Sequence, residues 1–104
     1  MNIDQLSKEL INNNINDKAC LINPRLCPEG ALCLKNNDDN VWVVTLNERG
    51  EFRINETFNS EHDACRFFLF KVISDPTYRN DFNPSDLINF KEMKKNLLKK
   101  YEFE

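Results

Sequence analysis

The segment from Asn40 to Phe70 constrains the fold of this chain more than any other segment. It contains a β-branched run with a tryptophan, the turn sequence Asn47-Glu48-Arg49-Gly50, a second alternating run and then a serine-capped apolar helix. This order is typical of a small antiparallel sheet that is followed directly by a helix. No arrangement of residues in it resembles a catalytic site, so it indicates a protein that acts by binding.

The length of the chain limits what it can build. With 104 residues and a mass of 12.3 kDa, residues 1–104 are predicted to form one domain with one modest core. Charged residues make up 30% of the chain and hydrophobic residues 40%, which is the balance of a folded globule rather than a disordered tail. An active site enclosed between two domains is therefore not expected.

Three or four strands are predicted before residue 60. Residues 31–35 and 41–46 are apolar or β-branched runs, and the polar cluster 36–40 between them is of the size and type that closes a hairpin. Alternation of apolar and polar residues over 52–58 predicts a further strand after the Gly-containing turn. Residues 19–22 are expected to form either an edge strand or an irregular loop.

Three helices are predicted around this sheet. They cover residues 3–15, residues 60–75 and residues 84–102, and a polar linker at 77–83 separates the last two. The apolar stripe of the central helix is too broad for one contact, so we expect it to pack on two sides. The predicted fold class is therefore α+β: a small antiparallel sheet of about three to four strands packed against helices.

The cysteines and the N-terminus bear on cellular location. The first residues are polar and include Asp4, no apolar run approaches the length of a membrane span, and the protein is expected to be cytoplasmic. The spacing of the four cysteines contains no Cys-x-x-Cys pair, and His62 is the single histidine. We therefore expect reduced thiols and no metal or cofactor, with a disulfide or a thiolate site as the alternative. The cysteines are Cys20, Cys27, Cys33 and Cys65.

Residues with catalytic potential also have simpler roles. His62 falls in the first turn of the central helix, where a solvated side chain is expected rather than a general base. Cys65 lies on the apolar stripe, which favours a core thiol over a nucleophile. Asp38 and Asp39 occupy a hairpin connection, where turn-forming acids are common, although a metal or acid/base pair is conceivable. The sequence therefore predicts that the protein is not an enzyme.

The distribution of charge favours a protein partner. Residues 28–63 contain eight acids and three bases, a local net charge of −5, whereas residues 84–104 contain five lysines and four acids. Direct binding to nucleic acid is disfavoured, because such proteins neutralise phosphates with a basic surface. An acidic surface accelerates and orients docking onto a basic protein.

Several short motifs resemble those of small bacterial immunity proteins from contact-dependent growth inhibition and related polymorphic toxin systems. The matching motifs are Val41-Trp42-Val43-Val44, then Asn47-Glu48-Arg49-Gly50, then Phe58-Asn59-Ser60-Glu61 with Ala64-Cys65 and an aromatic helix. The resemblance covers about residues 30–74. This chain departs from the pattern at Asn47, where a serine is expected, and at Val44-Thr45-Leu46, where aromatic residues are usual.

The resemblance implies an antitoxin that binds and occludes the C-terminal domain of one cognate toxin, often a basic nuclease. Arg49 would fix the register of docking, and Trp42 is either a core residue or an interface anchor. The residues expected to contact the toxin are Asp38, Asp39, Trp42, Glu48, Arg49, Glu51 and Glu56.

A second class of function stays open at this point. A small cytosolic adaptor or regulatory interaction module, possibly homodimeric, would use a free sheet edge or leftover apolar helix surface equally well. Neither class predicts a nucleic-acid or membrane partner.

Overall fold

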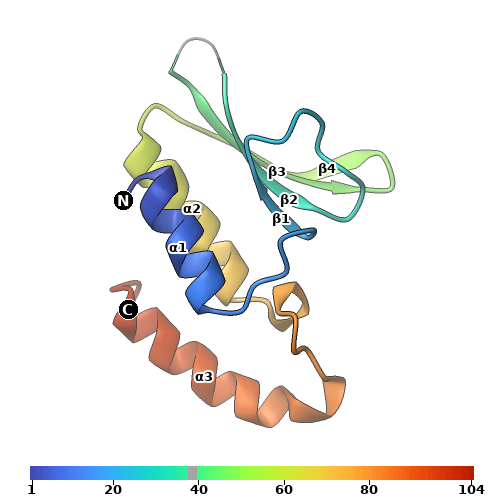
Figure 1. The fold of residues 1–104 in the computed structure, drawn as a ribbon, viewed down its shortest axis with the longest axis vertical. Helices are drawn as coiled ribbons and strands as arrows, with labels where there is room; N and C mark the ends of the chain where they lie inside the picture. Colours follow the sequence, from blue (N-terminus) through green and yellow to red (C-terminus); the bar gives the residue numbers. More distant parts are fainter. Residues whose placement is uncertain (38–39) are drawn as a thin grey trace.

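The fold is α+β, as predicted (Figure 1). A computed structural model describes residues 1–37 and 40–104, so the predictions made for Asp38 and Asp39 lie outside the described residues. In chain order the elements are α1 (Ile3–Asn12), β1 (Cys20–Ile22), β2 (Leu32–Asn36), β3 (Trp42–Glu48), β4 (Glu51–Phe58), α2 (Glu61–Ile73), the 3-10 turns η1 (Pro76–Tyr78) and η2 (Pro84–Asp86), and α3 (Leu87–Lys100).

The sheet is mixed rather than wholly antiparallel. Its strand order is β1-β2-β3-β4, and β2, β3 and β4 pair antiparallel as expected. The short edge strand β1 pairs parallel with β2, with Cys20 opposite Leu32. The two strands run in the same direction because the loop of residues 23–31 brings the chain back to the end of the sheet at which β1 starts, and β2 starts there too. Of the two alternatives predicted for residues 19–22, the edge strand is therefore correct.

Helix α2 packs on two sides, which confirms the expectation drawn from its broad apolar stripe. One side contacts the sheet and the other contacts α1 and α3. Its Phe68, Leu69 and Val72 are fully buried at the centre of the core. Each such side chain stabilises the fold by about 1.5–3 kcal/mol relative to an exposed one. Ser60 caps the helix as predicted, accepting a hydrogen bond from the Asp63 amide at 3.3 Å.

A polar seam joins the end of α1 to the end of α3. The Asn13 side-chain amide donates to the Tyr101 hydroxyl at 2.8 Å, and that hydroxyl in turn donates to Glu9. The Arg66 guanidinium donates to the backbone carbonyls of Tyr101 and, at 3.3 Å, Glu102. The C-terminal half of α3 is thereby fixed to the body of the protein.

The expectation of four reduced thiols is wrong for one pair. Cys27 and Cys33 form a disulfide, with their Cα atoms 6.0 Å apart, whereas Cys20 and Cys65 are free and buried. The pairing arises because loop 23–31 turns at Gly30, which has a left-handed φ of 82°, and lies across the outer face of β2. The loop thus covers the face of β2 on which Cys33 lies, opposite the face that packs on α2.

The predicted linker at 77–83 is anchored rather than extended. Tyr78 is only 9% exposed, and its carbonyl accepts a hydrogen bond from the Asn16 amide at 2.7 Å. The Asn80 amide donates to the Asn14 carbonyl at 3.0 Å. The polar composition of the segment concealed these contacts, because they use backbone groups and one tyrosine ring.

Candidate functional site

The β3–β4 hairpin is the element on which most of the predicted contact residues lie. Its two central turn residues, Arg49 and Gly50, have φ values of 52° and 80°, so both are left-handed, as in a type I′ turn. Such a turn matches the twist of the flanking strands. The pairing of β3 with β4 shifts by one residue between Leu46 and Asn47, close to this turn. Figure 1 shows this hairpin pointing away from α1 and α2, so its tip is open to a partner.

Carboxylates surround the hairpin tip. Glu48 and Glu51 lie opposite each other in the strand register, and both are exposed. Glu48 forms an ion pair with Arg53 at 3.2 Å, in which both side chains stay about half exposed, so the pair adds little stability. Within residues 1–37 and 40–104, the carboxylates of Glu51 and Glu56 have no hydrogen bond or ion pair. These two acids are the most available negative charges on the hairpin. Glu51 lies at the tip, whereas Glu56 lies five positions further along β4, opposite Val44.

Trp42 does not belong to this surface. It is only 7% exposed and packs in the core opposite Phe58, so of the two roles considered for it the structure supports the core one. It also lies at the opposite end of β3 from the turn, roughly 20 Å away at 3.3 Å per residue. The structure therefore brings Glu48, Arg49 and Glu51 together and separates them from Trp42.

Asn47 supports the base of the hairpin. Its side-chain amide donates to the Cys27 carbonyl at 3.1 Å, and its backbone carbonyl accepts from the Gly30 amide at 2.6 Å. Its own amide donates to the Ala31 carbonyl at 3.3 Å. The disulfide-closed loop therefore anchors the hairpin at the point where the strands leave the body of the sheet.

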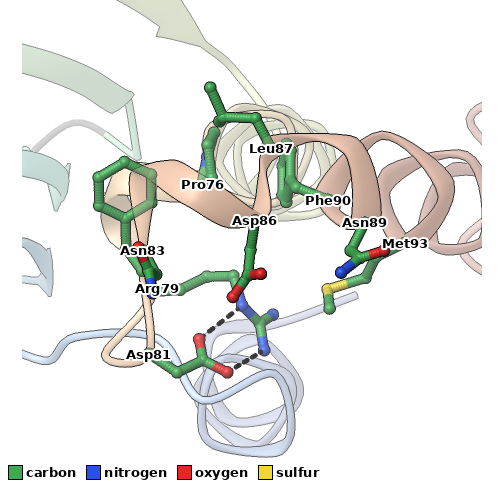
Figure 2. A pocket seen from close by; sticks show the side chains of 10 residues that line it. Pro76, Arg79, Asp81, Asn83, Asp86, Leu87, Asn89, Phe90 and Met93 are labelled. Carbon is green, nitrogen blue, oxygen red and sulfur yellow. Dashed lines mark hydrogen bonds and ion pairs between the residues drawn. The ribbon is translucent and has the colours of Figure 1, made fainter.

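Apart from the hairpin, the structure has a pocket between η1 and the first half of α3. Figure 2 shows this pocket, whose volume is about 130 Å³. Its apolar lining comes mainly from Phe82, Leu87, Phe90 and Met93, and its charged residues are Arg79, Asp81 and Asp86. We call this feature the α3 pocket.

An ion pair organises one wall of the α3 pocket. The Arg79 Nε donates to Asp81 Oδ1 at 2.9 Å, and Nη2 donates to Oδ2 at 3.3 Å, which is a two-point guanidinium–carboxylate contact. These hydrogen bonds from Arg79 lower the pKa of Asp81 below its ordinary value, so that carboxyl stays ionised. Asp86 lies at the N-terminus of α3 without capping it through its side chain, and Figure 2 shows its carboxylate directed toward Arg79.

The groups with catalytic potential are poorly placed for chemistry. Burial, reinforced by the charge of Glu61, raises the pKa of the Cys65 thiol to about 11, and this side chain is fully buried in the core. The prediction of a core thiol is therefore confirmed. His62 is exposed, as predicted, and its Nδ1 lies against the amino group of Met1. In the part of the chain that the structure describes, no three metal-ligating side chains come together. Among the same residues, no helix is both long enough and apolar enough to cross a membrane.

Comparison with known proteins adds no relationship: no family model, no curated protein and no solved structure matches this chain. The resemblance to immunity proteins therefore stays a prediction that rests on the motifs alone.

The α3 pocket is the part of the candidate surface that sequence reasoning missed. A helix is predicted at residues 84–102, but no opening beside it is predicted. Two adjacent signals could have indicated an opening: the unusually apolar start of the helix at Leu87-Ile88, and the acid-rich turn just before it.

Proposed function

We propose that this chain is an immunity protein that binds the C-terminal domain of a cognate toxin, a basic nuclease, and occludes its active site. The observation that carries the proposal is the β3–β4 hairpin, which extends from the body of the fold and presents the exposed carboxylates of Glu51 and Glu56. The motifs that resemble immunity proteins include this turn. Support therefore comes from both the sequence and the geometry.

Inhibition occurs by occlusion and requires no turnover. A nuclease binds phosphates through a cleft lined with lysine and arginine, and such a cleft attracts any rigid element that carries negative charge. The hairpin carboxylates occupy positions that the substrate phosphates would otherwise take. The type I′ turn fixes the backbone at the tip of the hairpin before binding, which reduces the entropy lost on docking.

A cytoplasmic location belongs to the same proposal, because the toxin would have to be neutralised where its nucleic-acid substrate is. The Cys27–Cys33 disulfide opposes this location, since disulfides are rare in reducing compartments. Thiol alkylation of the protein in rapidly quenched cells distinguishes the two cases. A pair that is alkylated in the cytoplasm fits the proposal, whereas a protected pair places the protein in an oxidising compartment.

The decisive experiment is co-expression with the toxin domain encoded beside the gene, scored by host survival and by recovery of a complex. We expect protection, and we expect the double variant Glu51→Lys, Glu56→Lys to weaken binding by about a hundredfold or more, because each reversal turns attraction into repulsion. The double variant Glu92→Lys, Glu104→Lys makes the same change in net charge at two exposed positions outside the hairpin and is the matched control. Unchanged affinity and protection in the double variant would contradict the proposal.

An adaptor that pairs with a second copy of itself is the other candidate. The observation that favours it is the outer edge of β4, together with Phe52, which is 59% exposed beside the turn. Sedimentation velocity over a range of concentrations tests it. A dimer that Phe52→Lys converts to monomer, without any toxin in the genetic neighbourhood, would replace the immunity proposal.

A further inference from the structure

Exposed apolar side chains are concentrated around the α3 pocket. Of the eight large hydrophobic residues that are strongly exposed among the described positions, four fall within residues 82–93. They are Phe82, Leu87, Ile88 and Met93, at 39%, 47%, 83% and 38% exposure. Three of the four line the pocket and Ile88 does not. A clustered apolar patch with a polar rim is typical of an interaction site, whereas scattered single residues are not.

The apolar stripe of α3 changes its environment halfway along the helix. At the C-terminal half, Leu98 and Tyr101 are buried against the body of the protein. At the N-terminal half, Leu87 and Met93 on the same stripe are open at the pocket. A helix that needed only to complete the core would not continue its apolar stripe beyond the covered half.

The size and the charge of the pocket restrict what can fill it. A volume of about 130 Å³ is well below the 300–1,000 Å³ or so of small-molecule sites, but it suits a single side chain. Two carboxylates, Asp81 and Asp86, and one guanidinium, Arg79, leave one net negative charge. Because Arg79 already binds Asp81 at two points, Asp86 is the group available to an incoming cation.

We infer that the α3 pocket receives one lysine or arginine side chain of the toxin, with its aliphatic stem against Leu87 and Met93 and its charged end at Asp86. This inference rests on the proposed function for the identity of the partner. Figure 1 shows that the hairpin tip and the start of α3 lie on the same side of the molecule, opposite the chain ends. Because both features lie on that side, one partner can contact both of them.

A second groove on the surface makes a weaker candidate. It lies between α1 and β1, has a volume of about 280 Å³, and is lined by apolar residues such as Leu10, Ile11 and Ile22. Asp17 is its one charged lining residue. The groove has little charge to indicate the chemistry of an occupant, whereas the α3 pocket combines an apolar wall with a defined carboxylate.

The first test needs no toxin. Chemical shifts of the full-length protein are followed during titration with n-butylguanidinium, n-butylammonium and, as a neutral control, n-pentanol. We expect the two cations to shift amides of residues 79–93 with dissociation constants of about millimolar size, as befits fragments of this size. The variant Asp86→Asn should weaken the cations by about fivefold and leave pentanol unchanged. Shifts that are absent from residues 79–93, or equal for all three probes, would overturn the inference.

The second test uses the purified complex with the toxin domain. Leu87→Ala removes an apolar wall of the pocket and should weaken binding by about tenfold, the effect of a moderate interface anchor. Its matched control is Ile88→Ala, which removes a neighbouring exposed apolar side chain outside the pocket. In the same assay Asp86→Lys should weaken binding more than Glu92→Lys, since Glu92 is an exposed acid of α3 that does not line the pocket.

The possible results separate this inference from the proposed function. If the hairpin variants weaken the complex and the pocket variants do not, the inference is wrong and the immunity function stands. If the fragments bind at the pocket but no toxin is bound, the proposed function fails, and the toxin as occupant fails with it. A chain that dimerises, and that Leu87→Ala returns to monomer, would show that the occupant is a second copy and would overturn the inference.

Discussion

The two halves of the sheet differ in how they are covered. Strand β2 is enclosed on both faces, by α2 on one side and by the disulfide-closed loop on the other, and three consecutive residues, Leu32, Cys33 and Leu34, have no exposure at all. Strand β4 has no fully buried residue and leaves one edge open. The difference indicates that β2 contributes more to the stability of the fold than β4, which leaves β4 free for the recognition proposed above.

The sharpest test of this difference is a pair of matched truncations. Leu34→Ala in β2 should lower the free energy of unfolding by about 3 kcal/mol, because it leaves a cavity in a fully packed site. Ile54→Ala in β4, where the side chain is only partly buried, should lower it by about 1 kcal/mol. Urea denaturation measures both values. Equal losses would show that the two halves are packed alike.

The second largest loss of stability is expected when the disulfide that closes the loop over β2 is removed. The variant Cys27→Ala, Cys33→Ala is expected to lose about 2 kcal/mol of unfolding free energy, since a closed loop of this length restricts the unfolded chain by that amount. Thermal or urea unfolding with and without dithiothreitol checks the prediction. The double variant is its own control, because its stability should no longer respond to the reductant.

Alkaline pH should also lower the free energy of unfolding, through Cys20 of β1, the strand that pairs with β2. Burial, reinforced by Asp75, raises the pKa of the Cys20 thiol from 9.0 to about 12, and burial raises that of Tyr78 to about 12 as well. Both groups are neutral when protonated, so the unfolded chain loses its protons first and stability falls as pH rises from 9 toward 12. For Cys20 the loss at pH 10 is on the order of 1 kcal/mol.

Unfolding free energies measured by urea between pH 8 and pH 10.5 test this slope. The variant Cys20→Ala should show a shallower decline than the parent chain, whatever its stability at neutral pH. Parallel curves for the two proteins would exclude Cys20 as a source of the pH dependence.

The smallest effect on stability is expected at the hairpin tip. Arg49 adopts a left-handed backbone conformation, which asparagine accepts readily, so Arg49→Asn should change the free energy of unfolding by only a few tenths of a kcal/mol. Arg49→Val places a β-branched residue in the same conformation and should cost about 1 kcal/mol. Thermal unfolding of the two variants checks the difference. If valine is tolerated as well as asparagine, the turn does not hold the geometry described.

Much of the architecture was accessible from local patterns. The cap at Ser60, the turn at Arg49-Gly50 and the period of the apolar residues each specify structure within a few residues, and the elements they predicted are present. The two-sided packing of α2 also followed from its sequence, because a stripe of that width has to be buried on more than one side.

The features that were missed depend on contacts between distant segments. The parallel pairing of β1, the burial of Tyr78 and the meeting of Cys27 with Cys33 are decided by where a loop returns, which neither periodicity nor spacing records. The role of Asn47 was missed for the same reason, since its partners lie in loop 23–31. Trp42 illustrates the converse case, because strand alternation left both of its roles open and only the packing decided between them.

The polar seam between Asn13 and Tyr101 has a consequence for the order of folding events. These two residues are separated by 88 positions, whereas the β3–β4 hairpin closes between neighbours in the chain. Loop closure over so long a separation is entropically unfavourable until the intervening segments are ordered, so the seam forms late. An interaction that forms after the transition state slows unfolding more than it speeds folding, so we expect the seam to contribute mainly to a slow unfolding rate.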